Sequence, residues 1–228
     1  MIQALLSDIA VQFSPAALAS SLSAEDMVLT DAIARAGLPI EVFVLDTGRL
    51  HADTLDLVAT VRRHYGIAVQ VYAPDADAVF QYLSRHGRDA FYGDLELRQR
   101  CCEIRKVEPL KRALAGKRAW ITGQRKDANT RSRLAEREYD ALNGLEKFNP
   151  LADWSEAQVW DYIRSHGVPY NRLYDQGYRS IGCAPCTRPV MPGEDLRAGR
   201  WWWEESTQKE CGLHITSDGR VVRAKVTV

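Results

Sequence analysis

The chain has 228 residues, a hydrophobic content of 46%, a charged content of 26% and a formal net charge of zero. This length and composition are ordinary for one large soluble domain, or for a domain with a tail. Because the sequence contains neither an apolar run long enough to span a membrane nor a signal-peptide pattern, we exclude a membrane protein and expect a cytoplasmic one.

The first half of the sequence alternates between strand-like and helix-like patterns. The expected strands cover 16–22, 41–45, 67–72 and 118–122, and the expected helices cover 24–36, 51–65, 75–86, 98–115 and 155–166. Units of this kind predict an α/β fold, in which helices flank a parallel twisted sheet. Ligands bind such sheets beyond the carboxyl ends of the strands, where we expect three polar loops, at 20–26, 46–49 and 123–131.

Positive charge is concentrated in one region. Residues 98–137 contain nine Arg and four Lys against four acidic residues. Charge runs are usually solvated helix faces, but this one also suits a site for a multiply anionic small molecule. We expect no nucleic-acid partner, because the whole chain is neutral and has no basic stripe interleaved with aromatic residues.

Four of the five cysteines form a spaced pattern, with Cys101 and Cys102 adjacent and Cys183 and Cys186 in a C-x-x-C turn. In a reducing compartment, clustered cysteines indicate a metal site or catalysis, and thiolates suit zinc or an iron–sulfur cluster. Adjacent ligands are unusual for structural zinc, and neighbours on a helix point roughly 100° apart. The pattern therefore favours a wide centre such as a [4Fe-4S] cluster. The alternative is a pair of core thiols and an unrelated second pair.

Together with other motifs, these cysteines closely resemble the assimilatory adenylyl sulfate (APS) reductases, relatives of the phosphoadenylyl sulfate (PAPS) reductases. The resemblance runs from about Ala19 to His214. Its blocks, in order, are 20–26, 45–49, Cys101-Cys102 with Arg105-Lys106, 122–125 with Thr130-Arg131, 181–187, 193–203 and 210–214. It departs from the family at Ser23, where glycine is common.

The resemblance implies an adenine-nucleotide α-hydrolase-like fold and a [4Fe-4S] cluster held by Cys101, Cys102, Cys183 and Cys186. It implies reduction of APS to sulfite and AMP, in sulfate assimilation and cysteine biosynthesis. Thioredoxin, or a glutaredoxin-like donor, would supply the electrons. Typical PAPS reductases lack the four ligands, so the expected substrate is APS.

Cys211 is the cysteine left over from this set and is the expected nucleophile. A thiolate can attack the sulfur of APS, expel AMP and leave an S-sulfonated cysteine, from which thioredoxin releases sulfite. Lys209 and His214 would lower the pKa of this thiol, and Glu210 would oppose them. The alternative is a surface thiol without a role. We expect a nucleotide- and cluster-binding domain over 1–200 and a mobile segment over 201–228 that carries Cys211.

The two adjacent anionic groups of APS require donors and cations close together. By resemblance, Ser20, Ser21, Ser23 and Asp26 form a phosphate-facing loop at a helix start, where N–H groups favour anions. The expected pocket residues next to it are Asp46, Thr47, Gly48 and Arg49. The expected contacts to the phosphosulfate are Arg125, Arg131, Arg197, Arg200 and His214, although a single arginine is more often a surface residue.

Lys106 follows Cys102 by four residues, one helical turn along the same face. We therefore expect it between the cluster and the bound anion. The aromatic residues Trp201–Trp203, Tyr170 and Tyr174 are expected to be structural.

Three rival functions stay open. They are a PAPS reductase, a zinc-stabilised nucleotide-binding module in which Cys211 is idle, and an ATP-splitting ligase or tRNA-thiolating enzyme. The first loop lacks the Ser-Gly-Gly-x-Asp-Ser layout of that last class. A possible homo-oligomer is not decided by the sequence.

Overall fold

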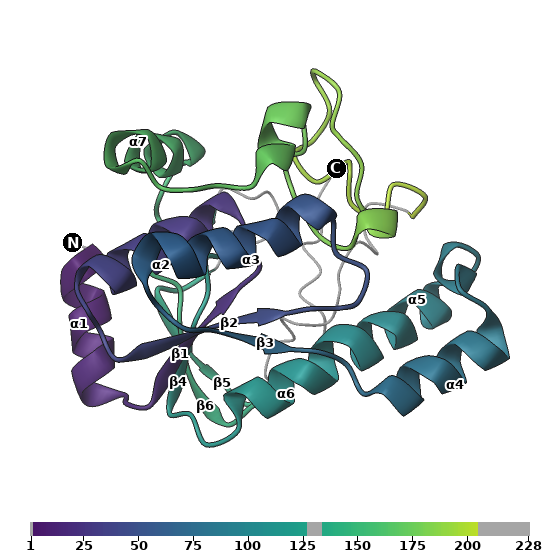
Figure 1. The fold of residues 1–228 in the computed structure, drawn as a ribbon, viewed down its shortest axis with the longest axis horizontal. Helices are drawn as coiled ribbons and strands as arrows, with labels where there is room; N and C mark the ends of the chain where they lie inside the picture. Colours follow the sequence, from purple (N-terminus) through teal and green to yellow (C-terminus); the bar gives the residue numbers. More distant parts are fainter. Residues whose placement is uncertain (1, 127–133, 205–228) are drawn as a thin grey trace.

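A computed structural model describes residues 2–126 and 134–204 of the chain (Figure 1). Six strands form one sheet in the order β3-β2-β1-β4-β6-β5. Neighbouring strands are parallel except β5, which is antiparallel to β6. The strands are β1 (Ala16–Ser20), β2 (Ile40–Leu45), β3 (Val69–Tyr72), β4 (Ala119–Ile121), β5 (Arg137–Asp140) and β6 (Leu145–Phe148). This arrangement confirms the predicted α/β class and its mostly parallel sheet.

The α-helices of the described residues follow the strands in the alternating manner expected. They are α1 (Ile2–Gln12), α2 (Ala24–Arg35), α3 (Ala52–Tyr65), α4 (Ala76–His86), α5 (Leu95–Cys102), α6 (Glu108–Leu114) and α7 (Glu156–His166). In the described part of the chain, no helix is long and apolar enough to cross a membrane.

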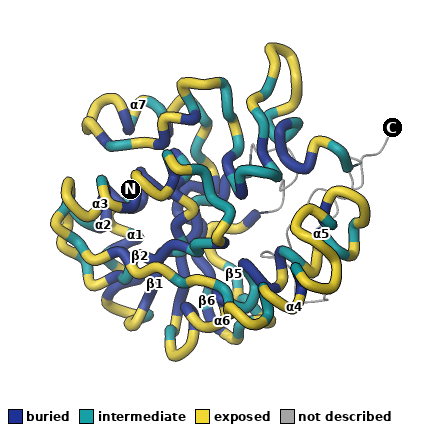
Figure 2. Tube along the Cα trace, turned by 45° about the vertical axis from the view of Figure 1, so that its right-hand side comes forward, coloured by how far each residue is buried: buried dark blue, intermediate teal, exposed yellow. Residues whose placement is uncertain are grey.

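Alternate residues of the central strands pack on opposite faces of the sheet. Leu18 of β1 belongs to a core cluster with α1, α2, α3 and α7, whereas its neighbour Ala17 packs with α6. In β4, Ile121 lies on the first face and Trp120 on the second. Figure 1 shows α2 and α3 on one side of the sheet and α6 on the other, and the strands between them are the buried centre of the molecule in Figure 2. The sheet is therefore a rigid support for the loops at its carboxyl edge.

Local sequence signals account for several helix boundaries. Ser23 caps α2, and Ser155 caps α7 through a reciprocal capping box with Gln158. The helices α3 and α7 end at Gly66 and Gly167, which adopt the left-handed conformation that glycine tolerates. These signals explain why the predicted boundaries at 24, 65 and 166 agree with the structure to within a residue.

The helix predicted around 98–115 is present as one helical run, but it differs from the prediction in two respects. The helix begins earlier, at Leu95 after the cap Asp94, and its middle, Glu103–Val107, is a π-helical turn between α5 and α6. The helix α1 and the β5–β6 hairpin were not predicted. The segment 205–228, and with it the expected residues Cys211 and His214, lies outside the described residues, as does Arg131.

Candidate active site: two adjoining cavities

A cavity of about 300 Å³ opens at the carboxyl ends of β1, β2 and β4. The strand order reverses between β1 and β4, and this switch point is where open α/β sheets bind ligands. The apolar side chains Phe43, Leu45, Leu110 and Trp120 line the cavity together with hydroxyl and charged side chains from the loops. Its size and its mixed lining suit a nucleotide.

The loop after β1 lines this cavity through Ser20, Ser21, Ser23 and Asp26. Ser21 donates both its backbone N–H and its hydroxyl to the Asp26 carboxylate, each at 2.7 Å. Ser20 and Ser23 instead accept hydrogen bonds, from the N–H groups of Leu22 and Asp26. Both hydrogen-bond donors of Ser21 are therefore used within the loop. The hydroxyl groups of Ser20 and Ser23 are the better donors to a bound anion.

Asp26 is buried at the start of α2, and the backbone of Gly123 lies against it. A Cβ at Gly123 would lie 2.5 Å from Asp26 Oδ1 and 3.1 Å from the backbone nitrogen of Asp26. Burial raises the pKa of Asp26 to about 6, although the hydrogen bonds from Ser21 act in the opposite direction. The loops after β1 and β4 are therefore in direct contact, and a side chain at position 123 would separate them.

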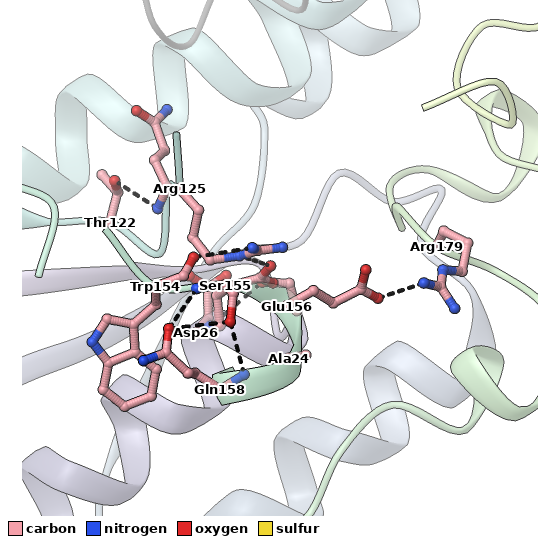
Figure 3. Close-up of polar contacts among 12 residues, drawn as sticks. Ala24, Asp26, Thr122, Arg125, Trp154, Ser155, Glu156, Gln158 and Arg179 are labelled. Atoms are coloured by element: carbon pink, nitrogen blue, oxygen red, sulfur yellow. Dashed lines mark hydrogen bonds and ion pairs between the residues drawn. The ribbon is translucent and has the colours of Figure 1, made fainter. Parts of the chain in front are cut away.

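Arg125 lines the cavity, but its guanidinium already has protein partners. Its Nε donates to Glu25 at 2.8 Å and its Nη1 donates to the Trp154 carbonyl at 3.2 Å. Arg179, which the sequence analysis did not select, also lines the cavity and pairs with Glu156 at 2.6 Å. Figure 3 shows the Glu156–Arg179 pair on the side toward which the Arg125 guanidinium points. Any contact of Arg125 with an anion is shared with Glu25.

Arg197 and Arg200 enter the same cavity from the segment before the tryptophans. Arg200 is buried, donates to the Ile181 carbonyl at 3.2 Å and lies over the Trp201 ring, 4.5 Å from its centroid. A Cβ at Gly182 would lie 2.5 Å from Nη2 of Arg200. The missing side chain at Gly182 is therefore what lets the guanidinium reach this position.

The loop after β2 joins the large cavity to the cysteines. Thr47 lines the cavity and its hydroxyl lies 3.2 Å from Cys183 Sγ. The Ala184 N–H donates to the Arg49 carbonyl at 2.7 Å, and Leu50 forms a β-bridge with Cys183. Asp46 and Gly48 do not line the large cavity, and Asp46 accepts a hydrogen bond from the Gly48 N–H at 2.8 Å. Of the four residues expected here, the structure places only Thr47 in the nucleotide-sized cavity.

All four clustered cysteines line a second, smaller cavity. Cys101 and Cys102 come from the end of α5, and Cys183 and Cys186 come from the turn that contains a short 3-10 helix, Ala184–Cys186. The basic residues around this cavity are Arg49, Arg98, Arg105 and Lys106. Two distant pairs of thiols are thus brought to one place and surrounded by positive charge.

None of the four cysteines of this cavity is in a disulfide bond. Burial raises the pKa of Cys186 to about 12, and the neighbouring Cys183 and Cys102 add to this effect. Burial also raises the pKa of Cys101, against the attraction of Arg105. Metal ligation requires thiolates, so a metal centre here would have to overcome the raised pKa of Cys101 and Cys186. Among the described residues, no three Cys, His, Asp or Glu side chains are arranged to ligate a single metal ion.

Lys106 and Trp201 line both cavities. Lys106 lies in the π-helical turn, and its positive charge partly opposes the rise in the pKa of Cys186. Trp201 is buried, whereas Trp202 is 40% exposed and Trp203 packs edge-on against Tyr92 with 4.4 Å between ring centroids. Trp201 is buried, as expected of a structural residue, and it also lies at the junction of the two cavities.

Several residues of the site were not selected from the sequence. Only Arg98 and Arg105 could have been selected from their position, since they lie one helical turn before and after the cysteine pair. Tyr174 was expected to be structural, and its hydroxyl does accept the Ala24 N–H at the start of α2, at 3.0 Å, but it also lines the large cavity. Gln124 lies in the resemblance block 122–125 but was not selected as a site residue. Nothing in the sequence singled out Arg179, because it lies in an irregular segment without a period.

Comparison with known proteins identifies the family of this fold and site. A family model described as phosphoadenosine phosphosulfate reductase domain matches residues 15–189, which include every cysteine of the small cavity. The chain belongs to the phosphoadenosine phosphosulfate reductase family. Within the family, it is 59% identical to an adenosine 5'-phosphosulfate reductase of Allochromatium vinosum, over 92% of this chain and 82% of that protein.

Two further members of the family are similar to this chain. An adenosine 5'-phosphosulfate reductase of Burkholderia cepacia is 54% identical over 95% of this chain and 87% of its own length. A crystal structure of a phosphoadenylyl-sulfate reductase from Candida auris, in complex with phosphate, superposes with a TM-score of 0.71 at 30% identity. That match covers 83% of this chain and 90% of the other. The family resemblance predicted from the motifs is thus confirmed.

Proposed function

We propose that this protein reduces adenylyl sulfate to sulfite and AMP, with Cys211 as nucleophile, a thioredoxin as electron donor and a [4Fe-4S] cluster held by Cys101, Cys102, Cys183 and Cys186. The observation that carries the proposal is the junction of a nucleotide-sized cavity with a four-cysteine cavity through Lys106 and Trp201. The high identity to reductases named for adenosine 5'-phosphosulfate supports APS as the substrate.

The residues of the small cavity fit an iron–sulfur cluster better than zinc. They offer four thiols and no imidazole. Of the four basic side chains, Arg98 and Arg49 are paired with Glu204 and Asp89, so Arg105 and Lys106 would contribute most to offsetting the negative charge of a cluster bound by thiolates. When bound, the cluster would supply a fixed electrostatic field beside the sulfate group.

The reaction divides into two transfers at sulfur. The Cys211 thiolate attacks the sulfur of APS, an S–S bond forms and the S–O bond to AMP breaks, so AMP leaves with the electron pair. A thioredoxin thiolate then attacks Sγ of Cys211 and expels sulfite, and the second thioredoxin thiol resolves the mixed disulfide. The dithiol is oxidised and the sulfur of APS is reduced by two electrons.

The residues of the large cavity would hold APS for this attack. Arg197 and Arg200 approach the cavity from one segment, and Arg200 is held in place by the Ile181 carbonyl and by Trp201. Lys106 would neutralise charge at the sulfate end, and Ser20 and Ser23 would donate to the phosphate. Charge neutralisation at the leaving group is the usual way in which such sites lower a barrier.

The test is a labelling experiment on anaerobically purified protein mixed with radiolabelled APS or PAPS without a donor, followed by a non-reducing gel. We expect label on the protein from APS, its release as sulfite by thioredoxin, and no label on Cys211→Ser. Label from PAPS alone would assign the chain to the other branch of the family. Label persisting in Cys211→Ser would remove that cysteine as nucleophile.

A second measurement separates the cluster from zinc. Purified protein should be brown and contain iron and sulfide, and Cys183→Ser should lose both. Colourless protein with stoichiometric zinc would favour a zinc-stabilised nucleotide-binding module. A glutaredoxin replacing thioredoxin in sulfite release would change only the donor.

A further inference from the structure

The side chain of Gln124 is a buried amide in the wall of the large cavity. It is 8% exposed, and its Nε2 is buried without a hydrogen-bond partner among the residues that the structure describes. A buried amide donor without an acceptor destabilises a protein, so the presence of such a group requires an explanation. The reaction proposed above does not use it.

The orientation of this amide is set by Lys147. The Lys147 ammonium donates to Gln124 Oε1 at 3.2 Å and to Glu138 Oε1 at 2.7 Å. An ammonium group only donates hydrogen bonds, so the atom of Gln124 that faces it must be the oxygen. The NH₂ group is thereby directed away from Lys147 and cannot be exchanged with the oxygen by a flip of the amide.

The backbone of the same loop is also held. The Gln124 N–H donates to the Thr122 hydroxyl at 3.3 Å, and that hydroxyl donates to Asn149 at 2.6 Å. Gln124 therefore sits on a network that reaches from β4 to β6. A donor fixed on both its backbone and its side chain loses little conformational entropy when an acceptor arrives.

Apolar side chains of the cavity wall lie near the Gln124 amide. Lys147, which orients the amide, lies 5.4 Å from the centroid of the Trp120 ring, and Trp120 lines the cavity together with Phe43, Leu45 and Leu110. Apolar and aromatic side chains of this kind suit a nucleobase. A nucleotide whose base packs against Trp120 would place its nucleoside beside Gln124.

We propose that Gln124 is a specificity-determining residue, whose Nε2 donates a hydrogen bond to an acceptor of the bound nucleoside, either a purine ring nitrogen or a ribose oxygen. The inference rests on the proposed adenine-nucleotide site. Lys147 is the positioning residue that presents the donor. A ligand without that acceptor would leave the donor unsatisfied and bind more weakly.

The test is calorimetric titration of the full chain with AMP and with adenosine. Gln124→Met removes the donor, and Gln124→Glu keeps an acceptor for Lys147 while removing the NH₂ group, so one variant remains if the other fails to fold. We expect both to weaken AMP binding by roughly 3- to 10-fold, the range of one neutral hydrogen bond, and Gln124→Met to weaken adenosine binding by the same factor. Gln70→Met, an exposed residue of β3, is the matched control and should bind as wild type.

The atom that accepts the bond follows from AMP analogues that lack one acceptor each, namely 1-deaza, 3-deaza, 7-deaza, 2'-deoxy and 3'-deoxy. One of them should bind wild type more weakly by the same factor and lose nothing further in Gln124→Met. Unchanged AMP affinity in both variants would overturn the inference, as would a loss for AMP that is absent for adenosine. A wild-type protein that binds no adenine nucleotide would overturn the proposed function as well, and the two failures are thus distinguishable.

Discussion

Arg98 of α5 and Glu204 form a buried, two-pronged ion pair. Nε and Nη2 of Arg98 each donate to Glu204 at 2.8 Å, and the two side chains are 1% and 6% exposed. Arg98 also lies over the Trp201 ring, 4.9 Å from its centroid, and lines the cysteine cavity. The pair therefore attaches the chain seven residues before Cys211 to the helix that carries Cys101 and Cys102.

Breaking this pair should destabilise the protein strongly, because one buried charge would remain without its partner. We expect Arg98→Met to lower the free energy of unfolding by about 3–5 kcal/mol in urea denaturation. The control is Arg164→Met, which removes an ion pair whose side chains are 66% and 72% exposed and should cost about 0–1 kcal/mol. Equal losses in the two variants would contradict the importance of burial here.

Replacing Gly123 by alanine should disturb both the fold and the site. The new Cβ would meet the Asp26 carboxylate and the backbone of α2, which cannot move aside as a side-chain tip can. Overpacking of this kind typically costs about 1–3 kcal/mol. We expect Gly123→Ala to lower the melting temperature and weaken AMP binding. At Gly93 the nearest atom to a Cβ would be 3.8 Å away, so Gly93→Ala should change neither measurement.

Asp26 should make stability depend on pH. Its pKa is raised by burial from 3.8 to about 6, so between these values the native state holds a proton that the unfolded state has released. The free energy of unfolding should therefore fall as the pH rises through this window, by on the order of 3 kcal/mol, and stay level above it. Urea denaturation across the window, compared between wild type and Asp26→Asn, measures this slope. Asp153→Asn, at an exposed position, should retain it.

Lys106 should matter to substrate binding because it lines both cavities. Removing a cation beside a divalent anion in a partly enclosed site weakens binding, here by roughly 10-fold. We expect Lys106→Ala to require more APS for half-maximal labelling of the protein. Lys111→Ala, five residues on and exposed on α6, tests whether any lysine of this region has the effect. Unchanged affinity and turnover in Lys106→Ala would remove it from the site.

Hydrophobic periodicity, caps and glycines were enough to predict the central strands β1 to β4 and the helices α2, α3, α4 and α7. These elements carry their own signals, such as Ser155 with Gln158. The hairpin β5–β6 carries none, since the charged residues Arg137, Glu138, Glu146 and Lys147 interrupt the apolar pattern of its two short strands. The π-helical turn at Glu103–Val107 was not predicted either, because it is a single turn inside a longer helical run.

The sequence by itself determined the family, the four clustered thiols and the basic composition of the site, because those depend on residue types and spacing. Only the tertiary structure decided which donors are already used, as with Ser21 and Arg125, and which are left, as with Gln124. It also decided that Thr47, rather than Asp46, lines the large cavity and contacts Cys183. Such outcomes depend on contacts between residues far apart in the chain, such as Gly182 with Arg200 or Lys147 with Gln124, and no local pattern records the distance between them.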